Sequence, residues 1–425
     1  MIDIKLIRDN PDIIRKDLEK RQDTEKLVWI DLIRDMDEEW RRKKKEIDEL
    51  RKQRNEFSKK IGEAKKKGED VSELLEKAAL IPEEIKNLEE EADSLKSRIN
   101  EYLMKLPNIT HKSVPYGKDE TENQEIKKWG EIEEHDFELK NHGEFLENLG
   151  GADFKRAAKI SGSGFYFLKG KFALLNQALI RFVIDKMVKK GYLFVQPPHM
   201  MRKMPYTGVT DLDSFKDVIY KIDDEDEYLI ATSEHPLTAM FMDEVVPEKD
   251  LPIKMVGLSH CFRKEIGSHG VDTKGLFRVH QFEKVEQIIL CKPEDSWNFH
   301  EELLKNAEEI FQDLEIPYRV VNICTGDLGS VAAKKYDIEA WFPRQQKYRE
   351  VVSCSNCTDY QARRLNIKYG YEGGKKELVH TLNSTAIALG RALVAIVENY
   401  QQKGGSLRIP KVLVPYMGGL EEIRP

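Results

Sequence analysis

The segment at residues 262–286, FRKEIGSHGVDTKGLFRVHQFEKVE, gathers side chains that recognise anions and amines. In its second half, Val279 and Val285 alternate with charged and aromatic residues, which is the two-residue period of a strand. Three glycines predict a turn between the two halves: Gly267, Gly270 and Gly275. In this hairpin, Arg278, Phe282 and Glu286 should share one face of the second strand. Arg263 and Glu265 should share a face of the first.

Side chains of these types fit a nucleotide and an amino acid. A guanidinium group presents paired N–H donors that match phosphate and carboxylate oxygens. An aromatic ring stacks on a base, and a carboxylate accepts hydrogen bonds from amines. The segment therefore indicates a pocket for ATP and an amino acid. A second interpretation stays open from these residues alone, namely a solvated hairpin whose ion pairs contribute roughly a few tenths of a kcal/mol each.

The length and composition of the chain indicate what kind of protein would contain such a pocket. The chain has 425 residues and a formal net charge of −7, which allows two or three domains and makes whole-protein attraction to nucleic acid unexpected. No apolar run approaches the ~20 residues that span a bilayer, and the N-terminus lacks the apolar core of a signal peptide. Five cysteines without regular spacing favour a reducing compartment. We therefore expect a cytoplasmic protein with no membrane partner.

Two heptad seams near the N-terminus predict a coiled-coil hairpin. The first steps by three and four with two basic interruptions: Ile33, Met36, Trp40, Lys43, Ile47, Leu50, Arg54, Phe57, Ile61 and Ala64. The second is apolar: Ile81, Ile85, Leu88, Ala92, Leu95, Ile99, Leu103 and Leu106. Gly68 lies in the break between them. Because each stripe needs a partner, the helices should fold back as an antiparallel arm on the order of 50 Å long.

Basic residues concentrate on the first helix of the arm: Arg41, Arg42, Lys43, Lys44, Lys45, Arg51, Lys52, Arg54, Lys59, Lys60, Lys65, Lys66 and Lys67. A soluble coiled coil of mixed surface charge accounts for them, and so does a helix that lies along a phosphate backbone. Pro82 removes a backbone donor, so either the second helix kinks there or residues 71–80 form a separate segment. The kink is favoured.

The remainder of the chain predicts an α+β domain. A polar, turn-rich linker at residues 106–123 precedes it. From about residue 165, helical patterns such as LLNQALIRFVIDKMVKKG alternate with the apolar runs LFVQ, VIYKI, YLIAT, EQIIL and YRVVNI. This order predicts helices that cover a mostly antiparallel sheet. Neither a P-loop nor a dinucleotide fold is indicated, because no GxxxxGK[ST] or GxGxxG motif lies between a strand and a helix.

These motifs resemble those of class II aminoacyl-tRNA synthetases, and more narrowly the seryl-tRNA synthetase family. Residues 262–286 resemble the second motif of the class. The other marks follow in the family's order: the coiled-coil arm, the linker, the triplet Thr232–Glu234, YREVVSCSNCTDYQARR and LNSTAIALGRALVAIVENYQ. The resemblance covers essentially the whole chain. It implies a serine–tRNA ligase with a tRNA-binding domain at residues 1–110 and a class II catalytic domain at residues 111–425.

The resemblance implies three catalytic arginines. Arg263 would contact the α-phosphate of ATP and the carboxylate of serine. Arg278 and Arg391 would bind the β- and γ-phosphates. No side-chain nucleophile is needed, since the serine carboxylate attacks the α-phosphorus itself.

The rest of the ATP site is implied in the same way. Glu265 would hydrogen-bond the adenine and Phe282 would stack on it. Glu350 and Ser353 would place Mg²⁺ at the phosphates, consistent with the preference of this cation for oxygen ligands.

The resemblance also implies a serine site. Thr232 and Glu234 would face the amino group, Glu286 and Thr385 the hydroxyl, and Asn383 would support them. From the residues alone, the Thr232–Glu234 triplet is also compatible with a helix start.

Partners are implied as well. The tRNA(Ser) would bind the arm through Arg41, Arg42, Lys43, Lys44, Arg51, Lys52 and Arg54. Whether a selenocysteine tRNA is charged too stays open. Residues 171–190 and the following LFVQPPHMM resemble the first motif of the class, whose proline lies at a homodimer interface, and Pro197 and Pro198 are the candidates.

The sequence raises three other interpretations. Zinc is not expected, because Cys354 and Cys357 form a CxxC pair without a second pair in the chain. A ligase that loads an amino acid onto a carrier protein would lack the long arm. A non-catalytic interaction protein on the same fold would be expected to have lost pocket residues that are present here.

Overall fold

The computed structural model describes residues 1–265, 275–371 and 373–425. Two of the three glycines assigned to the turn, Gly267 and Gly270, lie outside these ranges. The chain divides into two compact units, Met1–Ile109 and Thr110–Pro425. No helix of the described residues is long and apolar enough to cross a membrane.

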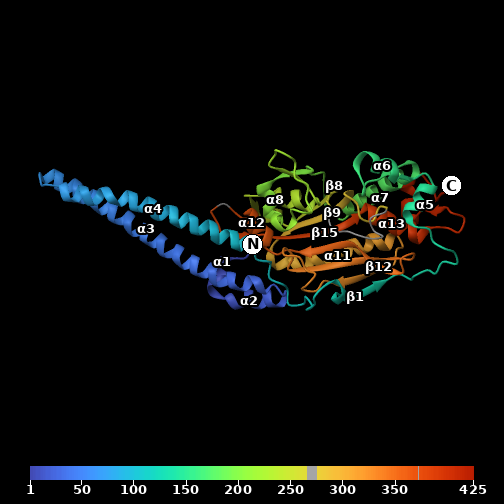
Figure 1. Ribbon diagram of the computed structural model, residues 1–425, viewed down its shortest axis with the longest axis horizontal. Coiled ribbons are helices and arrows are strands. Elements are labelled where there is room, and N and C mark those ends of the chain that lie inside the picture. Colours follow the sequence, from blue (N-terminus) through green and yellow to red (C-terminus); the bar gives the residue numbers. More distant parts are fainter. Residues whose placement is uncertain (266–274, 372) are drawn as a thin grey trace. The chain divides into compact units, whose positions relative to one another are not determined.

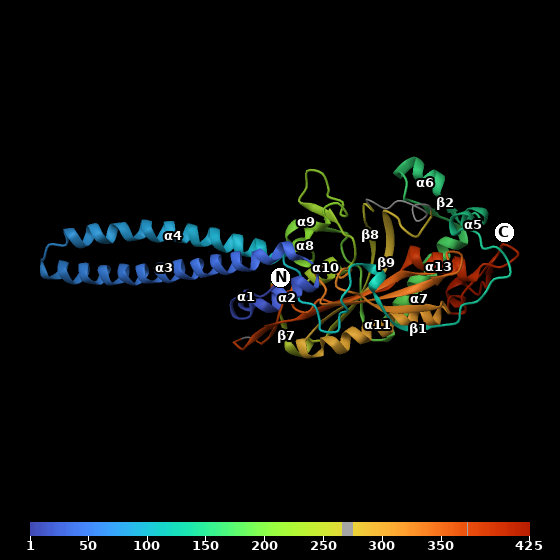
Figure 2. The ribbon, with the colours of Figure 1, turned by 60° about the horizontal axis from the view of Figure 1, so that its bottom comes forward.

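The first unit is helical (Figure 1). It comprises α1 (Ile4–Asp9), α2 (Pro11–Lys20), a 3-10 turn (Thr24–Lys26), α3 (Leu27–Lys67) and α4 (Ser72–Lys105). Helices α3 and α4 lie side by side as a hairpin (Figure 2). At ~1.5 Å per residue, the 41 residues of α3 extend roughly 60 Å. The predicted helical arm is confirmed.

The heptad seams are buried where α3 meets α4. One apolar cluster joins the two helices: Ile47, Leu50, Ile81, Ile85 and Ala92, with Trp40, Phe57 and Leu88 packed against it. The two basic positions of the first seam differ, since Lys43 pairs with Glu91 of α4 whereas Arg54 is exposed. Apolar burial, at about 25 cal/mol per Å², therefore holds the hairpin together.

Three of the seven residues expected to bind tRNA are engaged inside the arm. Like Lys43, Arg51 pairs with a glutamate of the other helix, Glu89, at 2.6 Å. Arg41 pairs with Asp37 at 3.0 Å. The other four form no ion pair within the described part of the chain: Arg42, Lys44, Lys52 and Arg54.

Helix α4 runs without a break from Ser72 to Lys105 and contains Pro82. The alternative that residues 71–80 form a separate segment is therefore wrong. Pro82 lies on the exposed side of the helix. Gly68 ends α3 in the left-handed conformation, with φ +74°, and its N–H bonds the last carbonyls of the helix.

An eight-stranded sheet forms the centre of the second unit (Figure 1). In spatial order its strands are β1 (Gln124–Trp129), β10 (Tyr318–Asn322), β11 (Lys334–Phe342), β12 (Lys347–Asn356), β15 (His380–Ala388), β9 (Gln281–Cys291), β8 (Ile253–Phe262) and β4 (Leu193–Val195). Only the β4–β8 pairing is parallel within this sheet as described. The predicted α+β class is confirmed.

Helices and short strands complete the unit. The helices are α5 (His142–Asn148), α6 (Phe154–Ser161), α7 (Gly170–Lys189), α8 (Lys203–Val209), α9 (Leu212–Phe215), α10 (Glu234–Ala239), α11 (Ser296–Asp313), α12 (Tyr360–Leu365) and α13 (Leu389–Tyr400). The short strands are β2 (Ala152–Asp153), β3 (Phe167–Leu168), β5 (Met200–Arg202), β6 (Glu227–Leu229), β7 (Val245–Pro247), β13 (Lys368–Gly370), β14 (Lys376–Leu378), β16 (Leu407–Arg408) and β17 (Glu422–Ile423).

Successive residues of β9 point to opposite faces of the central sheet. On one face, Asn176 of α7 donates a hydrogen bond to Glu283 at 2.5 Å. On the same face, Gln287 donates to the Leu303 carbonyl of α11 at 3.3 Å. The odd-numbered residues of β9 therefore face these helices, and the even-numbered residues point away from them.

The charged segment forms a strand pair, as predicted, but its arginines lie outside the strands. β8 and β9 pair antiparallel over their whole lengths. Arg263 follows the end of β8, and Glu265 has a φ of 49°, so the chain has left the extended conformation there. Arg278 precedes the start of β9. The predictions that Arg278 shares a strand face with Phe282 and Glu286, and that Arg263 and Glu265 share another, were therefore wrong.

The apolar run VIYKI at residues 218–222 is not a strand, unlike the other short runs. Its only described ladder contact is an isolated bridge between Lys221 and Tyr228. The Val218 carbonyl instead accepts a hydrogen bond from the Lys264 amide at 2.7 Å. The backbone groups of this run form hydrogen bonds to separate segments, so the run does not form a continuous strand.

Two glycines of the arm should respond in opposite ways to alanine. Gly68→Ala places a side chain at φ +74°, which should lower the free energy of unfolding by about 1 kcal/mol. Gly62 lies inside α3 with open space around it, so Gly62→Ala should raise that free energy by roughly 0.5–1 kcal/mol. Urea unfolding followed by far-UV circular dichroism measures both. Changes of the same sign would contradict the assigned turn.

Candidate active site

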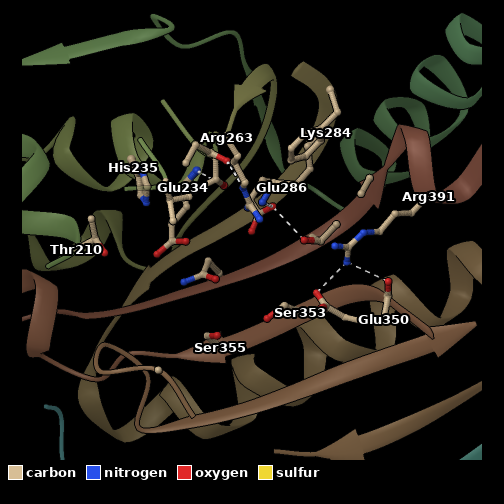
Figure 3. Close-up of a pocket in the computed structure, with 18 of the residues that line it drawn as sticks. Thr210, Glu234, His235, Arg263, Lys284, Glu286, Glu350, Ser353, Ser355 and Arg391 are labelled. Atoms are coloured by element: carbon tan, nitrogen blue, oxygen red, sulfur yellow. Dashed lines mark hydrogen bonds and ion pairs between the residues drawn. The ribbon is translucent and has the colours of Figure 1, made fainter. Parts of the chain in front are cut away.

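A cavity of about 390 Å³ lies on the face of the sheet toward which the even-numbered residues of β9 point (Figure 3). Its volume falls in the ~300–1,000 Å³ range of small-molecule pockets. Every residue that the sequence assigned to ATP or serine lines it: Thr232, Glu234, Arg263, Glu265, Arg278, Phe282, Glu286, Glu350, Ser353, Asn383, Thr385 and Arg391. Residues from three strands (β9, β12 and β15), two helix starts and the segments that flank β8 and β9 thus meet in one place.

Two arginines, each paired with a carboxylate, form a cationic end of the cavity. Arg391 of α13 pairs with Glu350 of β12 at 3.2 Å (Figure 3). Arg278 pairs with Glu265 at 3.4 Å, and its Nε is buried without a hydrogen-bond partner among the described residues. Glu350 is half-exposed; its partial desolvation opposes ionisation, but Arg391 and Lys335 outweigh this effect and hold the pKa of that carboxyl below its ordinary value. These cations therefore have donors that an anion can use.

Arg263 lies between the sheet and the loop before α10. Its Nε donates to the Ala231 carbonyl at 3.3 Å. Its guanidinium carbon lies 5.3 Å from the centre of the Phe282 ring, a cation–π contact. The arginine is therefore held in place while its remaining N–H groups face the cavity that it lines.

The triplet Thr232–Glu234 opens α10 at the edge of the cavity. Thr232 Oγ1 accepts a hydrogen bond from the Glu234 N–H at 3.2 Å, so the triplet starts a helix and lines the cavity at once. Ser233 Oγ donates to the Gly257 carbonyl at 3.3 Å. Gly257 permits this approach, because a Cβ there would lie 2.5 Å from Leu237 and 3.2 Å from Ser233.

Glu234 is a half-buried carboxyl group that accepts a hydrogen bond from Gln361. Gln361 Nε2 donates to it at 2.9 Å and also to the Val209 carbonyl, while Thr381 donates to Gln361 Oε1. Burial raises the pKa of Glu234 to about 7, and the nearby charge of Glu286 acts in the same direction. The Glu234 carboxyl therefore holds its proton more tightly than an ordinary glutamate until a cation binds beside it.

Glu286 provides the second carboxylate of this acidic end. It lies opposite Thr385 in the pairing of β9 with β15, and Thr385 Oγ1 donates to Glu286 Oε2 at 3.3 Å. Asn383 lies two residues earlier on β15 and donates to Cys357 Sγ at 3.7 Å. One cavity thus has a cationic end and an acidic end (Figure 3).

Several polar residues in or beside the cavity were not identified from the sequence, among them Lys284, Lys335 and Gln361. Lys284 lines the cavity and pairs with Glu286 at 2.5 Å. Its signal was present, because it lies between Phe282 and Glu286 in the same two-residue period. Gln361 and Lys335 come from distant segments, and no local pattern marks them.

The cysteines of the CxxC pair have different partners. Cys354 Sγ donates to the His300 carbonyl at 3.7 Å, whereas Cys357 Sγ accepts from Asn383. Across residues 1–265, 275–371 and 373–425, no group of three or more His, Cys, Asp or Glu is arranged to hold a metal ion.

Comparisons with known proteins decide the family. Residues 1–110 match the seryl-tRNA synthetase N-terminal domain, and residues 219–400 match the tRNA synthetase class II core domain (G, H, P, S and T). A serine–tRNA ligase of Methanocella arvoryzae is 58% identical over 423 residues, covering 99% of this chain and 100% of that protein. This chain belongs to the seryl-tRNA synthetase family.

Solved structures agree with membership in the seryl-tRNA synthetase family. The enzyme of Pyrococcus horikoshii, solved in complex with ATP, is 54% identical with a TM-score of 0.96 and full coverage of both chains. The cytoplasmic serine–tRNA ligase of Naegleria fowleri, solved with AMP, is 39% identical with a TM-score of 0.89, covering 100% of this chain and 99% of that one. The resemblance drawn from the motifs and the assignment to serine–tRNA ligases are confirmed.

In this member of the seryl-tRNA synthetase family, Glu234 should make stability depend on pH. Its folded-state pKa of about 7 exceeds the ordinary 4.5, so the folded protein holds the proton more tightly and loses stability as pH rises between these values. Glu234→Gln removes this titration. It should raise the free energy of unfolding of the ligand-free protein by up to about 3 kcal/mol near pH 8, and by little below about pH 4.

Urea unfolding of both proteins across this pH range measures the difference. A difference that does not change with pH would show that the Glu234 carboxyl titrates normally.

Proposed function

We propose that this protein activates L-serine with ATP and transfers the seryl group to tRNA(Ser). The observation that carries the proposal is the division of one cavity into a cationic end and an acidic end, in a chain of established family. The cationic end, with Arg278 and Arg391, suits the phosphates of ATP, and Arg263, which lies beside the acidic groups (Figure 3), can reach the phosphate nearest the amino acid. The acidic end, with Glu234 and Glu286, suits the ammonium and hydroxyl groups of an amino acid.

ATP would occupy the cationic end in the arrangement that the sequence implied. The Pyrococcus horikoshii relative, solved with ATP, supports this assignment. Arg263 would contact the α-phosphate, and Arg278 and Arg391 the β- and γ-phosphates. The ring of Phe282 would stack on adenine, and Glu265 would accept a hydrogen bond from its amino group.

Magnesium fits the oxygen donors beside these phosphates. Glu350 is half-exposed and Ser353 lines the cavity on the same strand, so both supply the oxygen ligands that this hard cation prefers. A bound Mg²⁺ would neutralise charge on the phosphates. Zinc has no comparable donor set in the described residues.

The reaction proceeds in two displacements. A serine carboxylate oxygen attacks the α-phosphorus, and the bond to the β-phosphate oxygen breaks to release pyrophosphate. A ribose hydroxyl at the tRNA end then attacks the seryl carbonyl, and AMP leaves. The chain contributes orientation and cations that stabilise charge developing on phosphate oxygens.

Serine selection would rest on paired hydrogen bonds. Glu234, with Thr232, would face the ammonium group, while Glu286 and Thr385 would bind the hydroxyl, supported by Asn383. Glycine and alanine leave the Glu286 carboxylate unsatisfied, so a site built for a hydroxyl rejects them strongly. Threonine has the hydroxyl but is bulkier, and must be excluded by size.

The arm would bind the tRNA. Residues 1–110 are assigned to tRNA binding and residues 111–425 to catalysis. The cations best suited to phosphate contact are those without an ion pair in the described residues, Arg42, Lys44, Lys52 and Arg54. Whether a selenocysteine tRNA is a second substrate is a matter for charging assays.

A homodimer would form along β4, the edge strand of the central sheet. Leu193 is 63% exposed and Phe194 is exposed beside it, so apolar side chains lie next to unpaired backbone groups. Of the two prolines in this motif, Pro197 is buried and Pro198 is exposed, which makes Pro198 the one able to contact a second copy.

Two further assignments complete the proposal. The five cysteines of the protein are buried, which suits the reducing cytoplasm where tRNA is charged. The match of residues 1–110 to a seryl-tRNA synthetase N-terminal domain favours this function over a carrier-protein ligase. The full set of pocket residues favours it over a non-catalytic protein.

Two substitutions should separate the ends of the cavity. Exchange of pyrophosphate into ATP should require serine and Mg²⁺. Glu286→Gln should lower kcat/KM for serine by a factor equivalent to about 2–4 kcal/mol of transition-state stabilisation, because a buried charged partner is lost. Arg278→Ala should act on ATP and kcat, because its partner charge develops as pyrophosphate departs. Unchanged serine kinetics in Glu286→Gln, or equal exchange with alanine, would contradict the serine site.

Paired and unpaired cations of the arm should differ in tRNA charging. Replacing Lys52 and Arg54 by Gln should raise KM for tRNA roughly 5- to 20-fold and reduce the salt dependence, since each lost phosphate contact lowers the slope by about one. Replacing Lys43 and Arg51 by Gln removes the same charge but acts on residues already paired with α4. Its effect on tRNA should be smaller, and pyrophosphate exchange should be unchanged in both. Equal loss in the two pairs would mean that net charge alone matters.

A further inference from the structure

Lys284 is a buried lysine that the roles above leave unused. It lies on β9 between Phe282 and Glu286, with its side chain only 8% exposed. Because residues two apart on a strand share a face, all three point into the same cavity. A lysine in such a place loses hydration, so a specific partner must hold it there.

That partner is the carboxylate of Glu286. The Lys284 ammonium lies 2.5 Å from Glu286 Oε2, and the Glu286 side chain is 2% exposed. Thr385 Oγ1 donates to the same oxygen at 3.3 Å. Both contacts recorded for this carboxylate in the described residues therefore end on Oε2, and Oε1 is left for another donor.

We propose that Lys284 is a positioning residue for serine, one that fixes Glu286 with Oε1 toward the substrate hydroxyl and supplies the positive charge that lets two carboxylates share the acidic end. This inference rests on the proposed serine-binding role of Glu286. Lys284 is not expected to contact the reacting atoms.

The second carboxylate, Glu234, shows why a cation is needed. Polar and titratable groups reach it from every neighbouring element: Glu286 and Lys284 on β9, Arg263 after β8, Gln361 on α12, Cys357 before α12 and Tyr206 on α8. Burial and Glu286 raise the pKa of Glu234, while Gln361, Lys284 and Arg263 lower it. Among the contacts of the described residues, Lys284 has a carboxylate of the acidic end as its direct partner, whereas Arg263 contacts the Ala231 carbonyl and the Phe282 ring.

Replacement of Lys284 should therefore weaken the use of serine and change its pH dependence. Without Lys284, Glu286 is a buried carboxylate close to another, so one of the pair should hold a proton at neutral pH. A protonated carboxyl binds an ammonium group poorly. The rise of kcat/KM for serine with pH should then move to higher pH, whereas ATP, bound at the cationic end, should be little affected.

Pyrophosphate exchange with serine and ATP varied separately, over a range of pH, tests this inference. In Lys284→Gln we expect KM for serine to rise at least 20-fold, KM for ATP to stay within about threefold, and the pH midpoint to rise by about one unit. Lys284→Arg keeps the charge, so its midpoint should stay within about 0.3 units of the unchanged protein. Lys254→Gln is the matched control, because Lys254 pairs with Glu302 from the neighbouring strand β8 outside the cavity.

The outcomes separate the two levels of the proposal. If the unchanged protein shows no serine-dependent exchange, the proposed function fails and this inference with it. If it does, and Lys284→Gln leaves the serine KM and the midpoint unmoved, only this inference is overturned. A midpoint shift in Lys284→Arg equal to that in Lys284→Gln also overturns it, because charge would not be the cause. Should Lys284→Gln not fold, the Lys284→Arg midpoint alone decides.

Discussion

Repulsion between like charges on a single sheet face is the constraint on which the catalytic unit depends. Two unit charges 4 Å apart interact by about 4 kcal/mol at an effective dielectric constant of 20, a large fraction of the stability of a domain. Here Glu234 and Glu286 line the same cavity as Arg263, Arg278 and Arg391. Each group is tolerated only because the fold brings an opposite charge or a hydrogen-bond donor beside it, so folding of the catalytic unit also assembles the site.

Much of this arrangement was predictable from local patterns, and the reasons are particular. The heptad seams fixed the arm because Ile47, Ile81 and their neighbours repeat at a spacing that only a helical hairpin buries. The two-residue period placed β9 and its pairing with β8. The same period failed for Arg278 and Glu265, since the strands end before those residues and the positive φ at Glu265 has no signature in the sequence. Gln361 could not be predicted, because its role depends on hydrogen bonds to residues of three segments that are distant in the sequence.

The arm illustrates a second limit of reading charge from sequence. Composition alone makes every lysine and arginine of α3 equivalent. The structure divides them into cations that hold α4, such as Arg51, and cations without a described partner, such as Lys52. Burial and the position of acidic residues on the facing helix decide which is which, and these follow from the register of the hairpin rather than from any local motif.

The close approach at Gly257 has a consequence for changing what the enzyme accepts. The strand that lies beside Glu286 meets the helix start that carries Glu234 there, where the Ser233 and Leu237 side chains pack directly on the bare Gly257 backbone. The spacing of these two walls is thus set by the absence of a side chain at Gly257. Any residue larger than glycine at this point would force the two walls apart together. Engineering room for a larger amino acid therefore has to begin at β15, where Thr385 is a removable side chain, and leave the backbone contact intact.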